Sequence, residues 1–576
     1  MNSKLTLTII PIFISFLVIF GSYINNIYAK NQLIILAILI ISIYPIIIYI
    51  FKSQIPKISY PIMIYFIALS LLFHISLFGS FINGADIQTE YYMANNVLKN
   101  SYWSQNIHSN VNSMLSIVMT VPIYSLILNY DTVLIFKIIY PIIFAFVPVL
   151  LFLTYKKMFG HEISFLSTVI FMFTPFFFLT MPFHARVQIA ELFVVSLIYI
   201  FCIKKLSPKE TLVGIIMMVG IVTSHYGTAY LFMFLLILVL LARYIPGDRK
   251  FFHFYDGMKI NLFFSFSILY ILVLISWYLY TSGGQPFRTI IDLGNSVYKN
   301  IFEDFLNLNS RDILSITMRN EDSLIRSIIK WLNGVVILSI MVGFLSVLFK
   351  KHKEANLDRN FFIFSFGGVI ILAASLLVPS FSDQLSFERL YQILLIFLAP
   401  FSIIGSKIFF RKYEIIISIF LSIFLLFNTG IISEIFHDDS PINVALNKSV
   451  PTHTQPFYMQ SDVIGSQWLG IYTINDINKD KYFGSNLQGE YIIRAFINGN
   501  IFMFNATTYD VCRSGRNYIL ITNKEIIYDQ ISSIETGQKF LAKMASFRNS
   551  SMSRRLVYIN KINDIKDTNV YFCQGQ

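Results

Sequence analysis

The sequence is poor in charged residues, which make up only 13% of its 576 positions. A soluble domain carries about 25%, so a soluble globular protein is excluded. Cysteine is scarce as well: there are three, with no C-x-x-C pair and no zinc-ligand spacing, which excludes a zinc module. Acidic residues are outnumbered 32 to 44 by Lys and Arg, giving a net charge of +12. In a membrane protein such an excess belongs to cytoplasmic loops, so we do not interpret it as nucleic-acid binding.

The chain is rich in long runs of apolar residues. It is 55% hydrophobic, with 57 Phe and 33 Tyr, which is typical of a mostly α, polytopic membrane protein. The run at 114–128 is short and contains Pro122, so we expect it to be re-entrant or interfacial. The first run lacks a small-residue cleavage site and predicts a retained helix. We expect thirteen transmembrane segments, at about 5–23, 33–51, 60–80, 132–154, 162–181, 187–203, 210–224, 227–245, 260–280, 329–349, 361–379, 390–409 and 414–435.

The distribution of basic residues orients these segments. With the N-terminus and Lys4 in the cytoplasm, every cytoplasmic connection is basic, as the positive-inside rule requires. These connections carry Lys52, Lys57, Lys156, Lys157, Lys204, Lys205, Lys209, Arg243, Arg249, Lys250, Lys350, Lys351, Lys353, Lys407, Arg411 and Lys412. Two large loops, 83–131 and 281–328, then lie outside. We therefore predict a transmembrane domain at 1–435 and an extracytoplasmic domain at 436–576.

The C-terminal region is predicted to be a small mixed domain. The stretches "SQWLGIYTINDINKDKYFGSN" and "RNYILITNKEIIYD" are typical of alternating helices and strands. Cys512 and Cys573 lie in this region, and they form one disulfide if it is outside the cell. Cys202 falls inside an apolar segment and is expected to be inert.

The stretch "NGADIQTEYYMANNVLKN" at 83–100 places acids directly after the third apolar segment. Asp86 and Glu90 are four residues apart, so a helix would bring them to one face. A neighbouring, mostly apolar stripe would contain Ile87, Tyr91, Ala94 and Leu98. This pattern predicts a short amphipathic helix with two acids beside its apolar side. The alternative is that Asp86 only caps the helix and Glu90 favours its first turn.

Other polar residues gather at the predicted outer ends of the transmembrane segments. Ionisable groups at the membrane edge are expensive, so each is a candidate functional residue. Simpler alternatives stay open: an Arg can extend to lipid headgroups, a lone His can be packed, and Arg186 and Glu191 can form a pair that only joins helices. The candidates are His184, Arg186 and Glu191 in "MPFHARVQIAELF", His225 and Tyr226 in "TSHYGTAYLF", Arg288 in "SGGQPFR", and Asp383, Glu388, Arg389 and Gln392 in "SFSDQLSFERLYQ".

One chemistry that needs this arrangement is transfer of a sugar from a lipid-linked phosphate. The leaving phosphate develops negative charge at headgroup depth, so cationic side chains are required there. The acceptor hydroxyl needs a carboxylate base beside the anomeric carbon. Tyr91, Tyr92 and Tyr226 could stack on sugars, but an interfacial aromatic belt explains most of them.

The layout resembles the GT-C class of polyprenyl-phosphate-dependent glycosyltransferases, in the style of archaeal multi-spanning members. "NGADIQTEYYMANNVL" is similar to the acidic first outer loop of that class, 101–128 to its second amphipathic helix, and "HARVQIAELF" to an Arg-bearing helix start. The resemblance covers about 60–435. It implies Asp86 as catalytic base, with Glu90 supporting it or sharing the role. It implies that the donor phosphate is bound by Arg186, His225 and Arg389, with His184 and Arg288 behind them.

The resemblance has limits that bear on the acceptor and on cofactors. No "WWDYG" occurs and the first loop has no Asp-x-Asp, which argues against an oligosaccharyltransferase. Two apolar segments precede the one that leads into the acidic loop, where the class often has none. No cofactor is required, although Asp86, Glu90 and Asp383 carry the hard oxygen ligands that a divalent metal prefers. The implied partners are a polyprenyl- or dolichyl-phosphate-linked sugar, a protein, lipid or glycan acceptor, and membrane lipids.

Three other functions remain open. A secondary transporter would place charges near the bilayer midplane in matching halves, and no such halves are visible. A lipid-linked polysaccharide ligase or polymerase would use the 281–328 loop, with Arg288, Arg311, Arg319 and Arg326, rather than an early acid. A non-enzymatic scaffold would leave the charges at the membrane edge unexplained.

Overall fold

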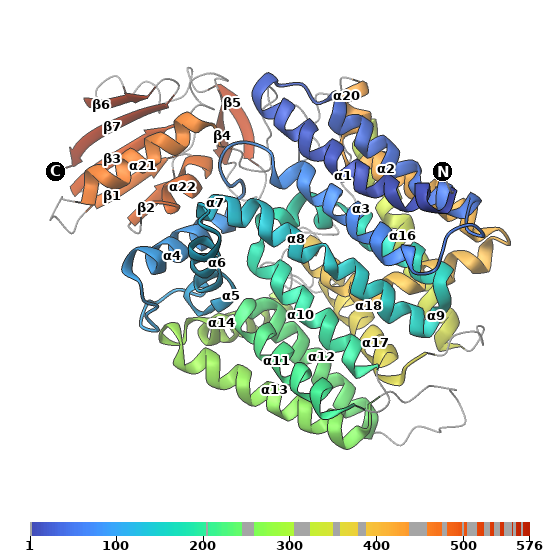
Figure 1. The fold of residues 1–576 in the computed structure, drawn as a ribbon. Helices are drawn as coiled ribbons and strands as arrows, with labels where there is room; N and C mark the ends of the chain where they lie inside the picture. The colour runs from blue at the N-terminus through green and yellow to red at the C-terminus, as the bar shows by residue number, and fades with distance from the viewer. Residues whose placement is uncertain are drawn as a thin grey trace.

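The computed structural model describes most of the chain, and its helices form one bundle with a sheet domain at one side (Figure 1). The described residues are 3–202, 206–244, 258–303, 323–349, 357–377, 387–436, 458–474, 481–485, 487–497, 500–503, 515–522, 530–534, 542–546, 556, 560–565 and 568–575.

Helices dominate, as the apolar composition predicts. The bundle contains α1 (Ser3–Tyr28), α2 (Gln32–Ile50), α3 (Ser59–Ser76), α4 (Asp86–Asn100), η1 (Val111–Ser113), α5 (Leu115–Val118), α6 (Thr120–Leu128), α7 (Thr132–Leu134), η2 (Ile135–Ile139), α8 (Tyr140–Phe144), α9 (Phe146–Phe173), η3 (Phe176–Thr180), η4 (Met181–Phe183), α10 (Ala185–Phe201), α11 (Pro208–Ser224), α12 (Tyr226–Tyr244), α13 (Ile260–Tyr280), η5 (Ser282–Gly284), α14 (Gln285–Glu303), α16 (Leu324–Leu348), α17 (Arg359–Leu377), α18 (Phe387–Phe409), α19 (Tyr413–Asn428) and α20 (Ile431–Ile435). Of these, η2 and η3 are π-helical and η1, η4 and η5 are 3-10 turns.

Each of the thirteen predicted apolar segments overlaps helical residues. Among the described residues, seven helical stretches are long and apolar enough to cross a membrane, counting Thr132–Phe173 as one although it bends at Gly160. Shorter apolar helices, such as Tyr413–Asn428, account for further segments. The count of thirteen crossings, their orientation and the domain boundary at 435 therefore stay predictions.

Large apolar side chains on the outside of the bundle agree with a lipid environment. Phe13 and Phe16 on α1 and Trp331 on α16 are more than 60% exposed. In water such a surface would be an aggregation hazard, whereas lipid tails cover it at no cost. The chain is therefore a membrane protein by fold as well as by composition.

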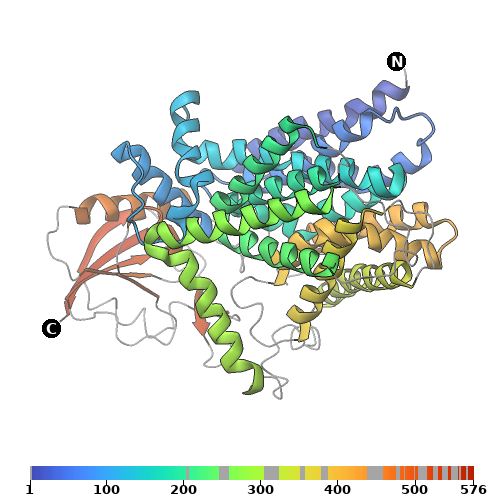
Figure 2. The same cartoon turned by 90° about the horizontal axis from the view of Figure 1, so that it is seen from below.

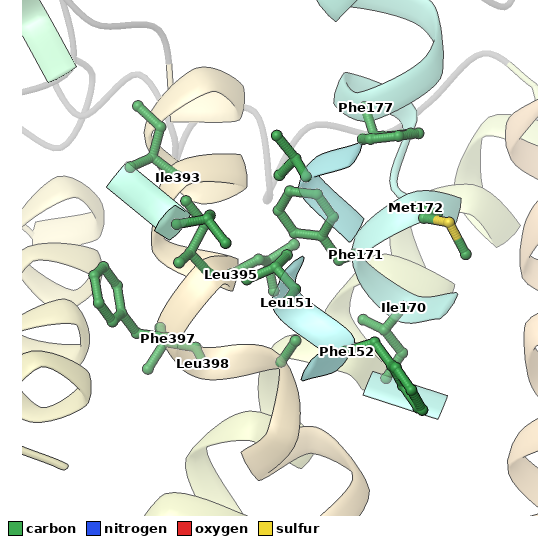
Figure 3. Close-up of a cluster of buried hydrophobic side chains, with 14 of the residues drawn as sticks. Leu151, Phe152, Ile170, Phe171, Met172, Phe177, Ile393, Leu395, Phe397 and Leu398 are labelled. Carbon is green, nitrogen blue, oxygen red and sulfur yellow. The ribbon is translucent and has the colours of Figure 1, made fainter. Parts of the chain in front are cut away.

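The position of α18 is fixed by its packing against α9. Leu395 of α18 lies beside Leu151 and Phe171 of α9 in a buried cluster (Figure 3). The ring of Pro400 cannot donate to the carbonyl of Ile396, and the hydroxyl of Tyr155 on α9 donates to that carbonyl instead, at 2.7 Å. This hydrogen bond satisfies the carbonyl that Pro400 leaves without its helical partner, and α18 continues through Pro400 from Phe387 to Phe409.

A close backbone approach locks α18 from its other side. A Cβ atom at Gly343 of α16 would collide with the carbonyl oxygen of Phe401, and one at Gly405 would collide with that of Ser339. Small residues at such crossings let membrane helices pack without a hydrophobic driving force. The two helices are thus in backbone contact, which only glycine permits.

The C-terminal residues form the predicted mixed α/β domain. Its elements are α21 (Gln460–Ile474), β1 (Lys481–Ser485), α22 (Leu487–Arg494), β2 (Asn500–Met503), β3 (Gly515–Ile521), β4 (Gln530–Ile534), β5 (Ala542–Ser546), β6 (Asn560–Ile565) and β7 (Thr568–Gly575). The main sheet has the order β2-β1-β3-β7-β6, parallel through β2, β1 and β3 and antiparallel at β7 and β6, while β4 and β5 pair separately. Figure 2 shows this domain at the same end of the bundle as α4.

The domain packs directly onto the segment that leads into α4. The Tyr458 hydroxyl donates to the carbonyl of Gly84 at 3.3 Å, and its backbone N–H donates to Asn83 Oδ1 at 3.4 Å. The ring of Phe496 stacks on Phe81 at 5.8 Å between centroids. The predicted disulfide lies outside the described residues, because Cys512 and the side chain of Cys573 are not among them. Cys202 is a free, buried thiol.

Candidate functional site

Asp86 is the first residue of α4 and lies against two arginines from distant parts of the chain. Its Oδ2 atom is 2.8 Å from Nη2 of Arg186 and 3.4 Å from Nη2 of Arg389. The N-cap position belongs to Ala85, which makes no side-chain cap hydrogen bond. The alternative that Asp86 only caps α4 is therefore wrong, because its carboxylate is engaged in ion pairs 100 and 303 residues away in sequence.

Arg186 is buried between the two acids of α4. Its side chain is 7% exposed, and its Nε atom lies 3.3 Å from Oε1 of Glu90, which is fully buried. The interpretation that Arg186 extends to lipid headgroups is wrong for this reason. The Arg186–Glu191 pair is wrong as well: Arg186 forms ion pairs with Asp86 and Glu90, and among the described residues it forms none with Glu191.

His184 lies between the arginines as a neutral ring. Its Nδ1 is 2.9 Å from the carbonyl of Thr180, which can only accept, so Nδ1 carries the proton. Its Nε2 then accepts from Nη2 of Arg389 at 2.7 Å and is 3.8 Å from Asp86 Oδ2. Burial and the charge of Arg389 lower the pKa of His184 to about 4. His184 therefore orients Arg389 rather than adding a positive charge.

The two acids of α4 have opposite pKa shifts. Burial works against the charged form of Asp86, but the charges of Arg186 and Arg389 outweigh it and hold the pKa of this carboxyl well below its ordinary value. For Glu90, burial dominates the attraction of Arg186, and the nearby Asp86 charge adds to it, so its pKa rises to about 7. Asp86 is thus a carboxylate at neutral pH, whereas Glu90 can hold a proton there.

The remaining predicted residues behave differently. His225 is buried and caps α12, with Nδ1 accepting from the backbone N–H of Thr228 at 3.1 Å. Burial, with Arg186 and Arg389 nearby, lowers its pKa, so it too is neutral beside the cluster. Arg288 is exposed on α14, and among the described residues it has no ion pair with Asp86. Asp383 lies outside the described residues.

Gln392, one of the candidates from the sequence, lies one turn after Arg389; it accepts a hydrogen bond from Thr174 at 2.6 Å and ties α18 to the end of α9. Two other residues that order the site, Gly84 and Lys137, are not among the sequence candidates. Gly84 adopts φ +103°, and a Cβ atom there would meet the Phe183 side chain at 2.6 Å, so only glycine lets the acidic loop approach His184. Lys137 binds that loop from the other side. A lone Lys in an apolar run is the sequence signal for such a residue.

The described side chains do not fit a divalent metal. Among them, no three His, Cys, Asp or Glu residues form a group that could bind one. The Oδ2 atom of Asp86 already faces the cations Arg186 and Arg389. A metal beside them would add positive charge to positive charge, so we derive no step through one.

The shift of Glu90 makes stability depend on pH. Between pH 4.5, its ordinary pKa, and about 7, the folded protein holds a proton that the unfolded chain has lost. Stability therefore falls as pH rises through this window, by up to about 1.4 kcal/mol per unit. We expect Glu90→Gln to lack this fall. The contribution of His184 changes in the opposite direction between about pH 4 and 6.5, but it is present in both proteins and cancels in their difference.

The measurement is thermal unfolding in detergent from pH 4.5 to 8 for wild type and Glu90→Gln. The unfolding temperature of wild type should fall relative to that of Glu90→Gln as pH rises, and this difference should level off above about pH 7. Glu434→Gln, a partly exposed acid that bonds to Asn31, is the matched control. A difference between wild type and Glu90→Gln that does not vary with pH would contradict the assignment.

The chain is similar to several solved structures at low sequence identity. One is the archaeal oligosaccharyltransferase AglB from Archaeoglobus fulgidus in complex with an inhibitory peptide and a dolichol-phosphate, with 11% identity and a TM-score of 0.48, over 82% of this chain and 70% of that one. Another is ArnT from Cupriavidus metallidurans bound to undecaprenyl phosphate, with 8% identity and a TM-score of 0.34, over 89% and 97% of the two chains. No curated protein sequence matches the chain.

A family profile matches the larger part of the sequence. It covers residues 209–571, from the start of α11 to the last strand of the C-terminal domain. Because that range is more than half of the 576 residues, the chain belongs to the family described as "Predicted membrane protein (DUF2206)".

Proposed function

We propose that this protein transfers a sugar from a polyprenyl-phosphate-linked donor to a hydroxyl group of an extracytoplasmic acceptor. The observation that carries the proposal is the meeting of Arg186 and Arg389 at one carboxylate oxygen of Asp86. Two guanidinium groups with one carboxylate leave a surplus positive charge whenever Glu90 is protonated. That surplus matches the single negative charge of a sugar–phosphate–lipid diester.

Exposure distinguishes the roles of the two acids. The Asp86 side chain is 38% exposed, whereas Glu90 is fully buried behind Arg186. A substrate can therefore reach Asp86, and Glu90 serves to orient the guanidinium of Arg186. Asp86 is also ionised at neutral pH, as a general base must be before it accepts a proton.

The proposed reaction assigns a role to each of these side chains. Asp86 takes the proton of the acceptor hydroxyl as its oxygen bonds to the anomeric carbon of the sugar. The bond between that carbon and the phosphate oxygen breaks, and the electron pair leaves with the polyprenyl phosphate. Arg186 and Arg389 stabilise the charge that develops on this leaving group. His184, neutral and bonded to Arg389 at 2.7 Å, keeps that guanidinium in place. The orientation of the site toward the outside is part of this proposal.

The test is transfer by purified protein in lipid nanodiscs. Polyprenyl-phosphate sugars labelled in the sugar are supplied with a membrane extract as acceptor, and label in the acceptor is measured. Transfer from these monophosphates supports the proposal. Transfer only from lipid-linked diphosphate polymers would favour a ligase or polymerase, and sugar flux across proteoliposomes without covalent transfer would favour a transporter.

The donor site can be tested separately from the chemistry. Arg389→Gln removes one charge-assisted contact to the phosphate, worth about 1.5–3 kcal/mol, so we expect binding of polyprenyl phosphate to weaken about 10- to 100-fold. Arg411→Gln, at an exposed Arg after α18, should bind as wild type does. Equal affinity of Arg389→Gln and wild type would remove Arg389 from the site.

A further inference from the structure

Lys137 is a buried cation that the proposed reaction does not use. It lies in the π-helix η2, six residues into a stretch of chain that is otherwise apolar, and it is 7% exposed. A π-helix accommodates one extra residue per turn and is frequent at functional sites. A buried ammonium group is expensive unless all of its donors are satisfied.

All three donors of Lys137 go to the loop that precedes Asp86. Its Nζ atom donates to the carbonyl oxygens of Phe78 at 2.9 Å, Gly79 at 2.6 Å and Phe81 at 3.1 Å. An ammonium group has three N–H donors, so none remains for a substrate. Among the described residues no carboxylate forms an ion pair with it. Lys137 therefore acts on the backbone of residues 78–81 and on nothing that reacts.

The loop transmits this restraint to Asp86 through side-chain hydrogen bonds. Asn83 Nδ2 donates to the carbonyl of Phe78 at 2.8 Å and closes the loop. Gln88 Nε2 donates to the carbonyls of Ile82 at 3.0 Å and Gly84 at 3.1 Å, which joins the loop to the first turn of α4. Asp86 lies between these anchored positions, so its carboxylate can move little relative to the arginines.

The other end of the restraint is equally firm. Ser76 Oγ, in the last turn of α3, donates to the backbone carbonyl of Lys137 at 2.8 Å. Ile135 and Phe136, the two residues before Lys137 in the same π-turn, are buried in one cluster with Ile82 and Ile87. The backbone of Lys137 is thus held in place, and its side chain ties the loop 78–81 to that backbone.

We propose that Lys137 is a positioning residue for the transfer reaction: it holds the loop 78–84 so that Asp86 reaches the arginines and the acceptor together. This inference rests on the proposed function. It predicts a defect in turnover rather than in donor binding, because Arg186 and Arg389 belong to other helices. A base displaced by about 1 Å is expected to lose up to about 100-fold in rate.

The variant Lys137→Met keeps the length of the side chain and removes its donors. We expect kcat, normalised to the number of donor-binding sites, to fall about 10- to 100-fold, with KM for the donor changed less than threefold. Normalisation removes the effect of misfolded protein, which a merely structural role would produce. Lys99→Met, at an exposed Lys in the last turn of α4, is the matched control and should keep wild-type kcat.

Chemical rescue covers the case in which Lys137→Met does not fold. In Lys137→Ala, ethylammonium can enter the vacated space and donate to the same carbonyls. It should raise the kcat of Lys137→Ala at least tenfold. A normalised kcat equal to that of wild type in Lys137→Met, or no rescue in Lys137→Ala, would overturn the inference. Failure of the proposed function looks different, because the wild-type protein itself would then transfer no sugar.

Discussion

Replacing Asp86 by Asn is expected to lower sugar transfer by about 100- to 10,000-fold, the range that a positioned general base contributes. The amide has the size and shape of the carboxylate but cannot take the proton of an acceptor hydroxyl. The measurement is label transfer in nanodiscs under donor saturation, so that the loss is assigned to the chemical step. Donor binding should persist, because Arg186 and Arg389 are then relieved of a competing anion.

The matched control for this change is Asp131→Asn. Asp131 belongs to the same predicted outer segment, and its side chain accepts a hydrogen bond from the backbone N–H of Val133 at 2.7 Å. Asn retains this cap, so Asp131→Asn should transfer at the wild-type rate. Full activity of Asp86→Asn would leave an enzyme whose base lies elsewhere, and attention would turn to the 281–328 loop.

Local features of the site were predictable because they depend on nearby sequence. The helix from Asp86 to Asn100 begins at the residue where its acids and apolar stripe begin, since a spacing of three to four residues needs only helix geometry. The mixed character of the C-terminal domain followed from short apolar runs in the same way. The run at 114–128 forms two short helices, α5 and α6, but the break between them lies at Met119, and Pro122 is inside the first turn of α6. Its re-entrant or interfacial position stays a prediction.

The pairing within the site could not be predicted from spacing. Asp86 meets Arg389 across 303 residues because α18 is fixed by α9 and by the glycine contacts with α16. The sequence indicates which residues are candidates, but the order of helices around the bundle decides which of them touch. For that reason the sequence leaves open a pair between Arg186 and Glu191, five residues apart on one helix, although the two side chains have different surroundings.

Residues whose role is to bind the backbone of a loop could not be predicted from the sequence. Lys137 and Gln88 bind carbonyl oxygens of the loop 78–84, and backbone carbonyls leave no signature in a sequence. The signals that exist are indirect. A Lys within an apolar run is too costly to be accidental. Gln88 lies two residues from both Asp86 and Glu90, so on a helix it points to a different side from them.

Removal of the Arg186 guanidinium is expected to have the largest effect on stability. Arg186→Met would leave the fully buried Glu90 and the partly buried Asp86 without their shared cation. Breaking a buried ion pair from one side costs about 3–5 kcal/mol. Because Asp86 is 38% exposed and water can screen it, the lower end of this range applies. The measurement is denaturation in detergent at pH 8, where both acids are charged in the unfolded chain.

Glu90 provides the test of this cause. If the loss in Arg186→Met arises from an uncompensated buried acid, then Glu90→Gln in the same chain should recover most of it, since the amide needs no counter-ion. Lowering the pH to about 5 should recover stability of Arg186→Met as well, because Glu90 is then protonated. An equal loss in the single and double variants, at both pH values, would mean that Arg186 acts by packing alone. Recovery by both routes would tie the buried acid, the guanidinium and Asp86 into one electrostatic unit, in which the charge of Arg186 is left for Asp86 and the phosphate only while Glu90 is neutral.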